Sequence, residues 1–195
     1  MKKIISGILF LSMLMSSGCG ALQTGFSNAY NLVNCDYKYR SIGNLSISDM
    51  NLANGLTPLM IPKLLAILSG NVSSIPLFFT INMDVNNPNA GTAAFQSLLY
   101  IISIDDVKFT TGNVNQAFRV ESGETKLLPV EIGVDLIELM KNNSRSAIEN
   151  IVKNFVGLSD TASKVSIQLK PSFKVGEQTF ASPVYIPVNF TFGGK

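Results

Sequence analysis

The sequence predicts a mainly β protein, built as a two-layer antiparallel β-sandwich of about seven strands with one helix before its C-terminal hairpin. Apolar residues recur at every second position through most of the chain, a spacing that gives a strand one buried and one exposed face. Helical spacing replaces this alternation mainly between residues 135 and 155. Strands with one apolar face each bury those faces together, and two stacked sheets achieve this.

The predicted strands are recognised by their alternating apolar residues. The first strand carries Val33, Cys35, Tyr37 and Tyr39 on one face. At the other end of the chain, a turn over residues 174–178 is predicted to join the last two strands in a hairpin. The other apolar faces consist of Leu45 and Ile47; Phe79, Ile81, Met83 and Val85; Leu98, Tyr100, Ile102 and Ile104; Leu128, Val130, Ile132 and Val134; Val165, Ile167, Leu169 and Phe173; and Val184, Ile186, Val188, Phe190 and Phe192.

The segment 135–155 departs from the alternation and predicts a helix. Asp135 and Glu138 fit a capping box at its start, and Gly157 is suited to ending it. An interruption at residues 142–144, which read Asn-Asn-Ser, would divide it into a short turn of helix and a longer helix. We expect the helix to bridge the two sheets or to cover one end of the sandwich, with its apolar stripe facing the core.

The segment 56–68 is strongly apolar and is the second departure. Thr57 and Pro58 predict the start of a short helix, with Thr as the cap and Pro at the first helical position. A buried connection is the favoured interpretation, because such runs are usually buried. The alternative is an exposed surface for a partner or an apolar ligand, formed by Leu59, Met60, Ile61, Leu64 and Leu65.

The N-terminus has the layout of a secretory signal peptide over residues 1–18. Lys2 and Lys3 precede an apolar stretch that is too short to span a bilayer, and small residues follow it. Ser-Ser-Gly-Cys ending at Cys19 resembles the lipobox of bacterial lipoproteins, although Ser16 stands where Leu is commonest. The resemblance implies cleavage before Cys19 and acyl chains on its sulfur. An ordinary signal peptide with a chance cysteine is the alternative.

This processing would divide the chain into a lipidated tether over residues 19–32 and one domain over residues 33–195. The acyl chains would hold the protein on a membrane, which places it in the cell envelope. Gly20 is not the Asp that favours inner-membrane retention in enteric bacteria, and this favours the outer membrane. Loss of Lys2 and Lys3 leaves 13 basic and 13 acidic residues, so we expect no nucleic-acid partner.

The composition argues against catalysis. Histidine is absent from the 195 residues, which excludes Ser-His-Asp and Cys-His mechanisms and the commonest zinc ligand. Residues 84–95 begin like an EF-hand loop, but Pro88 and Phe95 replace needed ligands, so we expect no metal. We expect a protein that is not an enzyme and has no cofactor other than the acyl chains on Cys19.

The remaining polar groups have simpler interpretations. Asp105 and Asp106 could bind a hard cation, but a solvated turn is the favoured interpretation. Glu121 and Glu124 fit the tip of a hairpin, and their spacing gives no reason for the unequal pKa values that a glycosidase pair needs. With Cys19 acylated, Cys35 has no disulfide partner and is predicted to be a small buried hydrophobe. A reactive thiol at Cys35 is the alternative, but no His or cluster of basic residues lies near it in sequence to lower its pKa.

One stretch resembles a known family. Residues 81–89 form a predicted strand that ends in Asn87, Pro88 and Asn89, and a second apolar strand follows. This arrangement resembles the late embryogenesis abundant (LEA) type 2 domain, also called the water-stress and hypersensitive-response domain. Residues 124–131 fit the family's next strand. The resemblance covers residues 33–192 and implies an immunoglobulin- or fibronectin-III-like sandwich without catalytic residues.

Two functions are compatible with these features of the sequence. The first is a non-enzymatic module of the envelope, with an accessory, stress-protection or interaction role. The second is a carrier or sensor of a lipid or other apolar ligand, in which residues 56–68 and the helix stripe line a cavity. A tightly packed core without an apolar pocket would count against the carrier.

Overall fold

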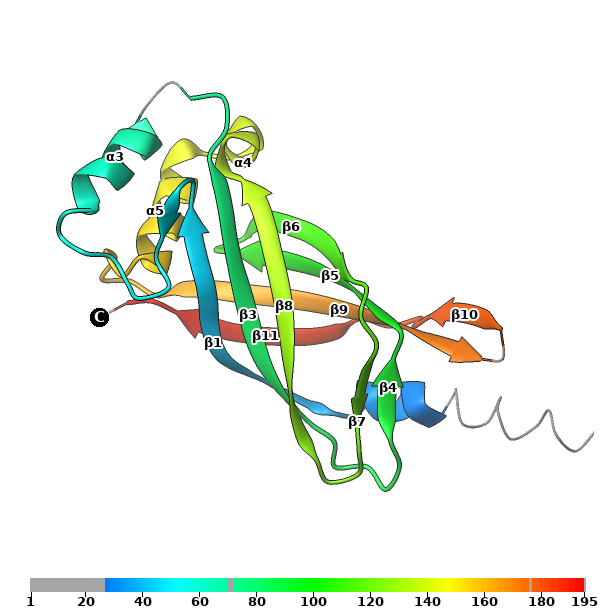
Figure 1. Ribbon diagram of the computed structural model, residues 1–195. Helices are drawn as coiled ribbons and strands as arrows, with labels where there is room; N and C mark the ends of the chain where they lie inside the picture. Colours follow the sequence, from blue (N-terminus) through cyan, green and yellow to red (C-terminus); the bar gives the residue numbers. More distant parts are fainter. Residues whose placement is uncertain (1–26, 70–71, 176, 195) are drawn as a thin grey trace, which may run out of the picture.

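The computed structural model describes residues 27–69, 72–175 and 177–194 of the chain (Figure 1). The described part is mainly β, with two main antiparallel sheets that enclose one apolar core, three helices gathered at one end and the N-terminal helix 27–33 away from them (Figure 1). The predicted β-sandwich is therefore confirmed. Its alternating strands bury one face each, as the period-two spacing requires.

The first sheet has the order β2-β1-β3-β8. Its strands are β1 (Asp36–Ile47), β2 (Met50–Asn51), β3 (Pro76–Asn86) and β8 (Thr125–Asp135). Strand β1 is continuous through two register shifts against β3, so the two predicted strands at its start and end are one strand. Such bulges bend a strand and let it follow the twist of its sheet.

The second sheet consists of β5 (Ser97–Ile104), β6 (Val107–Val114), β9 (Ser163–Val175), β10 (Gln178–Ala181) and β11 (Ile186–Phe192). Strands β10 and β11 both pair with β9, at its two ends. The predicted C-terminal hairpin is thus present, but a connection interrupts its second strand. The prediction for Val184 was wrong, because this residue is exposed in that connection.

Strand β6 was not predicted. It follows β5 through Asp105 and Asp106, whose φ values of 49° and 64° are typical of a two-residue type I′ turn. Val107 and Phe109 at the start of β6 are buried in the core, and Val114 at its end is half-buried against it. The rest of the strand has no apolar alternation by which the sequence could reveal it.

The β5–β6 hairpin continues into a small second ribbon. Strands β4 (Ala93–Phe95) and β7 (Phe118–Val120) pair with each other in a sheet of their own. Residues 121–124 then connect β7 to β8. The turn predicted there is present, but the prediction of a hairpin was wrong, because β7 pairs with β4 and β8 pairs with β3.

The two predicted helical segments are both helical, and the start of one of them differs from the predicted position. The segment after Asp135 divides into α4 (Leu136–Asn142) and α5 (Arg145–Phe155), and the Asp135 carboxylate accepts a hydrogen bond from the Ile137 N–H at 2.8 Å. Helix α3 (Ile61–Ser69) starts three residues later than predicted. Starting at Ile61 keeps Pro62 in the first turn, where its missing N–H breaks no helical hydrogen bond.

The N-terminal boundary differs from the predicted one. Residues 27–33 are helical, and Leu32 in this helix is 1% exposed. The segment 27–32 is therefore part of the folded domain instead of a tether, and Val33 lies in the helix and not in β1. Residues 28, 31, 32 and 35 recur at helical spacing, which explains how a short polar segment presents one side to the domain.

Candidate functional site

The Asn87-Pro88-Asn89 turn that suggested the family lies at the end of β3 and is built around one buried side chain. Asn87 is fully buried, and its Nδ2 donates to the carbonyl oxygens of Gly91 at 2.9 Å and Val120 at 3.1 Å. Its Oδ1 accepts from the backbone N–H and the Nδ2 of Asn89. Both ends of the buried amide are thus satisfied, as burial of a polar group requires.

The same turn holds the N-terminal helix. The Asn89 Nδ2 donates to the Asn31 carbonyl oxygen at 2.9 Å, and the Asn31 Nδ2 donates to the Thr92 carbonyl oxygen at 3.0 Å. We call Asn31, Asn87 and Asn89 the asparagine cluster. It joins helix 27–33 to the loops before β4 and after β7, so that the chain entering the domain is fixed to one end of the sandwich.

Cys35 and Tyr37 complete this junction. Cys35 is buried and its thiol lies 3.3 Å from the Asn31 carbonyl oxygen, while the Tyr37 hydroxyl donates to the Leu32 carbonyl oxygen at 2.9 Å. Burial, and then the nearby Asp36 carboxylate, raise the pKa of the Cys35 thiol to about 11. Burial likewise raises the pKa of the Tyr37 hydroxyl. Cys35 is therefore the neutral, buried thiol that the sequence predicted.

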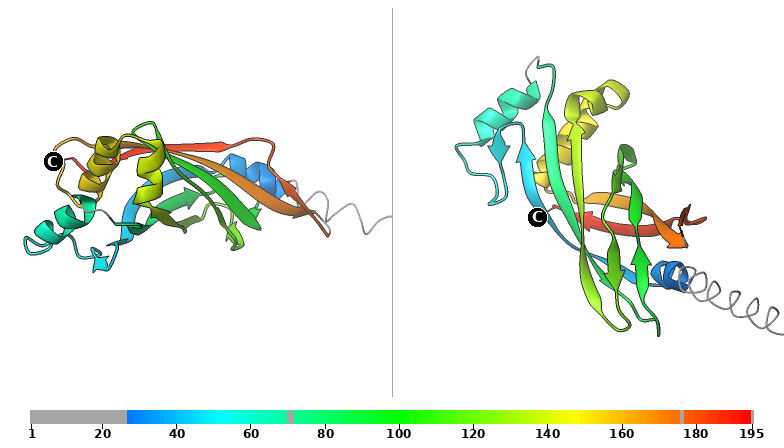
Figure 2. Two further views of the ribbon diagram at one scale, coloured as in Figure 1. Left: turned by 90° about the horizontal axis from the view of Figure 1, so that it is seen from above. Right: turned by 45° about the vertical axis from the view of Figure 1, so that its right-hand side comes forward.

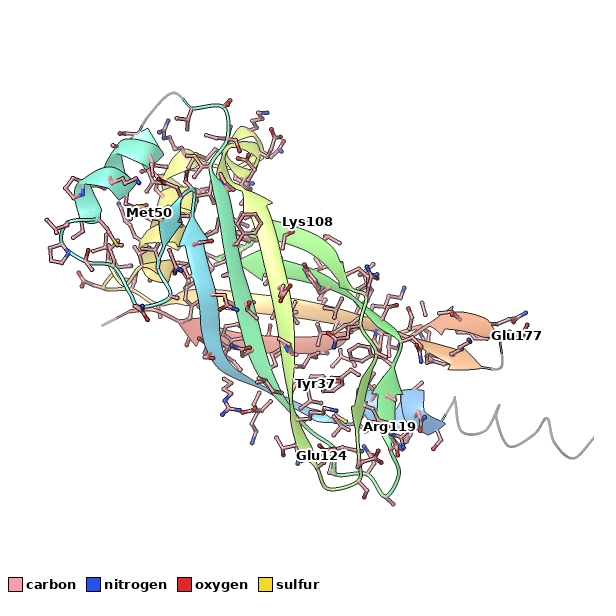
Figure 3. The ribbon with its side chains drawn as sticks, viewed as in Figure 1. Tyr37, Met50, Lys108, Arg119, Glu124 and Glu177 are labelled. Carbon is pink, nitrogen blue, oxygen red and sulfur yellow. The ribbon has the colours of Figure 1, made fainter. Side chains whose placement is uncertain are left out.

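Figure 3 places this junction within the whole molecule. Tyr37, Arg119 and Glu124 lie toward one end, and Met50 lies toward the end that carries α3, α4 and α5 (Figure 3). At the 121–124 turn, the Glu124 carboxylate accepts from the Glu121 backbone N–H at 2.8 Å, and the Glu121 carboxylate pairs with Arg119. These acidic groups have local partners, which is typical of a structural turn.

The five residues of the predicted apolar surface differ in their exposure. Leu64 is 1% exposed and packs in the core, whereas Leu59 is 92% and Leu65 is 48% exposed. Met60 and Ile61 are half-buried. The two interpretations of this segment, a buried connection and an exposed surface, therefore each describe one side of it.

The predicted helix stripe packs against other side chains. The Phe155 ring lies 4.6 Å from that of Phe79 and 4.7 Å from that of Phe192, measured between ring centroids. Phe109 completes the group at 6.1 Å from Phe79. We call Phe79, Phe109, Phe155 and Phe192 the phenylalanine cluster. It fills the sandwich beneath α5, where the carrier hypothesis would place a cavity.

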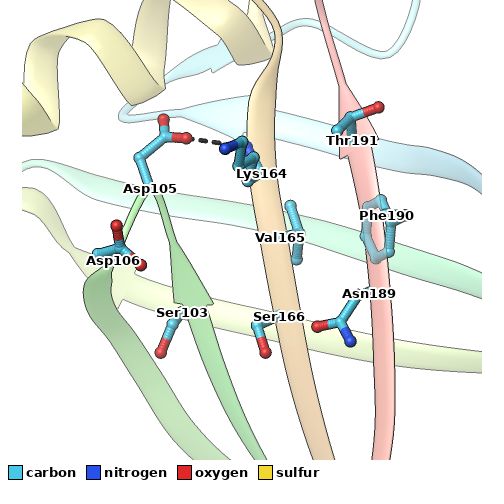
Figure 4. A pocket seen from close by; sticks show the side chains of 9 residues that line it. All are labelled: Ser103, Asp105, Asp106, Lys164, Val165, Ser166, Asn189, Phe190 and Thr191. Carbon is cyan, nitrogen blue, oxygen red and sulfur yellow. Dashed lines mark hydrogen bonds between the residues drawn. The ribbon is translucent and has the colours of Figure 1, made fainter.

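A surface hollow of about 490 Å³ lies elsewhere, over β5, β9 and β11 (Figure 4). Asp105 and Lys164 border it, and the Asp105 carboxylate accepts from the Lys164 backbone N–H at 2.8 Å. The other Asp105 oxygen accepts from the Ser163 hydroxyl. Both oxygens thus hold the β5–β6 turn against β9, and the turn predicted at these aspartates is confirmed.

Asn154 is a buried polar residue that the sequence did not reveal, since it lies within the helical pattern. Its Nδ2 donates to the Ser163 hydroxyl at 2.6 Å, and that hydroxyl in turn donates to Asp105. These two hydrogen bonds fix the Asn154 amide so that its Oδ1 faces Gly193. The Oδ1 atom has no hydrogen-bond partner among the described residues. The amide borders a groove of about 390 Å³ between β1 and the end of β11.

Asn31 was also missed, because it lies in the segment read as a tether. The spacing of Asn28, Asn31, Leu32 and Cys35 was the available signal. Cys19, the predicted lipidation site, lies outside the described residues. Within the described ranges, no three His, Cys, Asp or Glu side chains form a group suited to a metal, and no helix there has the length and apolarity needed to cross a bilayer.

Comparison with known proteins gives only distant likenesses. No family model matches the sequence, and no curated protein matches it. A protein from Archaeoglobus fulgidus is similar in structure, with 13% identity over 81% of this chain and 98% of that chain and a TM-score of 0.39. AT1g01470 from Arabidopsis thaliana has 11% identity over 80% of each chain and a TM-score of 0.40.

A third similar structure is that of a protein named as a late embryogenesis abundant protein, At2g46140.1. It has 12% identity over 99% of this chain and 89% of that chain, with a TM-score of 0.40. These TM-scores are all below 0.5, so membership of the LEA type 2 family stays a prediction from the sequence.

Proposed function

We propose that the protein is a membrane-anchored, non-enzymatic interaction module of the bacterial cell envelope, held by acyl chains on Cys19. The observation that carries the proposal is the division of the apolar residues of segment 56–68, which includes α3 and the turn before it. Leu64 anchors the helix in the core, while Leu59 and Leu65 stay exposed. A large exposed apolar side chain such as Leu59, beside a helix fixed from below, suits contact with a partner protein.

The place of α3 also supports this function. Strand β3 has 11 residues, so its first and last residues lie about 34 Å apart at about 3.4 Å per residue. The asparagine cluster follows its C-terminal end, and α3 precedes its N-terminal end (Figure 1). A lipid attached at Cys19 would hold the first end near the membrane and leave α3 free for a partner in the envelope.

The carrier alternative has less support. The phenylalanine cluster occupies the volume beneath α5, and Leu64 and Leu68 of α3 are buried against the core. A carrier would need these side chains to leave an apolar cavity. Measuring whether lipids co-purify with the domain separates the two functions, because an interaction module would carry none in its core.

The anchor is tested with Cys19→Ala. We expect this variant to appear in the soluble fraction while the parent protein fractionates with membranes, because the acyl chains supply the membrane affinity. The mass of the N-terminal peptide should show the lipid on Cys19 in the parent only. Cys35→Ala is the matched control and should remain with the membranes; a membrane-bound Cys19→Ala protein would contradict the anchor.

The partner surface is tested by photo-crosslinking in the native envelope. A photoreactive amino acid replaces Leu59 or Leu65, and the control replaces the exposed Lys108 on β6 (Figure 3). We expect a discrete crosslinked protein at positions 59 and 65 that is absent at position 108. The surface is excluded if the three positions give the same products, and crosslinks to lipid alone would favour a lipid-binding role.

A further inference from the structure

We propose that helix 27–33 and the β9–β10 hairpin form a membrane-contact surface. This surface would contact the headgroup region of the phospholipid bilayer into which the acyl chains of Cys19 insert. This inference rests on the proposed Cys19 anchor and adds the orientation of the domain. Both elements extend on one side of the molecule in each of the three views, away from the helices α3 and α5 (Figures 1 and 2).

The hairpin projects beyond its sheet. Strand β9 pairs with β5 only as far as Ser172, and the pairings of residues 173–175 join them to β10. All four residues of β10 are exposed, including the large ring of Phe180, which is 40% exposed. A two-stranded ribbon buries little surface by itself, so an exposed aromatic residue on such a ribbon is suited to a surface that covers it.

Helix 27–33 presents a second apolar side in the same region. Asn31 and Leu32 face the domain, whereas Tyr30 is 70% and Val33 is 37% exposed. Tyr30 and Val33 are three residues apart and therefore share one side of the helix. The helix lies beside the base of the hairpin, since Asn28, Phe173 and Lys174 line one small hollow of about 70 Å³.

The chemistry of this surface fits a bilayer interface. A tyrosine combines an apolar ring with a polar hydroxyl, and such side chains gather at the level of lipid headgroups. In the connection that follows β10, Tyr185, 42% exposed, lies beneath the Lys170 ammonium, whose Nζ is 5.1 Å from the ring centroid. Lys174 and Glu177 give the hairpin both signs of charge, so the surface matches zwitterionic as well as anionic lipids.

The length of chain between the anchor and the domain selects the bilayer over other apolar partners. Residues 20–26 are seven in number and span at most about 25 Å when fully extended. The described part of the domain begins directly after them with helix 27–33, which is held to the sandwich by the asparagine cluster. The exposed residues of this surface therefore stay within a short distance of the membrane that binds the acyl chains.

The absence of tryptophan from the chain permits a direct test. Tyr30→Trp, Phe180→Trp and the control Leu59→Trp each introduce one fluorescent reporter at an exposed position. The lipidated proteins are reconstituted in vesicles of phosphatidylcholine with phosphatidylglycerol. We expect the emission at positions 30 and 180 to shift to shorter wavelength and to be quenched by lipids brominated on their acyl chains, while the emission at position 59 is unchanged.

The outcomes separate the orientation from the anchor. The proposed contact surface would be overturned if all three reporters on the vesicle-bound protein gave the same unquenched emission spectrum. Quenching at position 59 only would overturn it as well. If mass spectrometry finds no acyl chains on Cys19, the proposed anchor fails by that measurement. The orientation is then measured after a maleimide-phospholipid is coupled to Cys19 in the Cys35→Ala background, with the same three reporters and the same expected order.

Discussion

At the end of the sandwich that carries the Asn87-Pro88-Asn89 turn, buried amides join separate loops, whereas at the end that carries α5 aromatic rings fill the space between the sheets. Asn87 alone makes four hydrogen bonds with its side chain. Phe155, in contrast, contacts three other phenylalanine rings. The polar end fixes backbone positions, and the apolar end supplies burial that depends little on direction.

The difference suits the two ends to different tasks. Directional hydrogen bonds hold helix 27–33 in one position relative to the sandwich, which an anchored domain needs if one side is to face the membrane. The apolar end gives α3 a firm base through Leu64 and Leu68 while Leu59 and Leu65 remain exposed. The comparison leads to three predictions, given from the largest expected effect to the smallest.

Removal of an aromatic ring from the apolar end should have the largest effect. Phe79→Ala opens a cavity between Phe109 and Phe155, and we expect it to lower the free energy of unfolding by about 3–5 kcal/mol. Urea unfolding measures the change. Phe78→Ala is the control, because the neighbouring Phe78 is 52% exposed on the opposite side of β3 and should cost less than about 1 kcal/mol. Equal losses would contradict the location of the core.

Removal of the central amide from the polar end should have a smaller effect. Asn87→Ala leaves the carbonyl oxygens of Gly91 and Val120 without their donor, and we expect a loss of about 2–4 kcal/mol. Asn86→Ala, one residue earlier, removes an exposed hydrogen bond to Thr125 and should change stability by less than about 0.5 kcal/mol.

Hydrogen exchange sharpens this second prediction. Loss of the Asn87 amide should also increase exchange in helix 27–33, because Asn87 positions Asn89 and Asn89 binds the Asn31 carbonyl oxygen. The amide protons of α5, at the other end, should be less affected by local opening. Protection that stays unchanged in helix 27–33 would show that the asparagine cluster does not hold it.

The smallest effect concerns the single carboxylate that caps α4. Burial opposes ionisation of Asp135, but hydrogen bonds from the Ser74 hydroxyl and from the N–H groups of Ile75 and Ile137 outweigh it and hold its pKa below the ordinary value. A lowered folded-state pKa stabilises the fold above the unfolded pKa, and this stability is lost as the pH falls through the folded value.

We therefore expect Asp135→Ala to cost about 1 kcal/mol at neutral pH and to lose less further stability than the parent below about pH 4. Urea unfolding at several pH values measures both effects. Asp135→Asn is the matched control, since it retains an acceptor for the Ile137 N–H without the charge. The lowered pKa would be contradicted if the free energies of unfolding of the parent and of Asp135→Ala changed in parallel with pH.

Much of the sandwich could be predicted from local pattern. The faces of β3 and β5, and most of that of β8, are buried as their alternation indicates, because strand geometry alone assigns successive side chains to opposite sides. The interruption between α4 and α5 is also local, since asparagine and serine favour turns and caps. Strand β6 was missed because most of it lacks apolar alternation, and its position depends on pairing with β5.

The asparagine cluster and the membrane-contact surface depend on residues far apart in sequence. Asn31 and Asn89 are separated by 58 positions, and only the packing of helix 27–33 against the loops brings them together. Likewise, spacing showed that residues 56–68 were apolar, but the position of α3 against the core decided that Leu64 is buried and Leu59 exposed.

The sequence by itself determined the apolar faces of the strands and the absence of histidine, and it alone supports the prediction of a lipid at Cys19. Each of these depends on residue type and near neighbours. The tertiary structure decided which polar groups meet and which apolar groups remain exposed. Those outcomes depend on contacts between distant segments, which form only when the two sheets close around their common core.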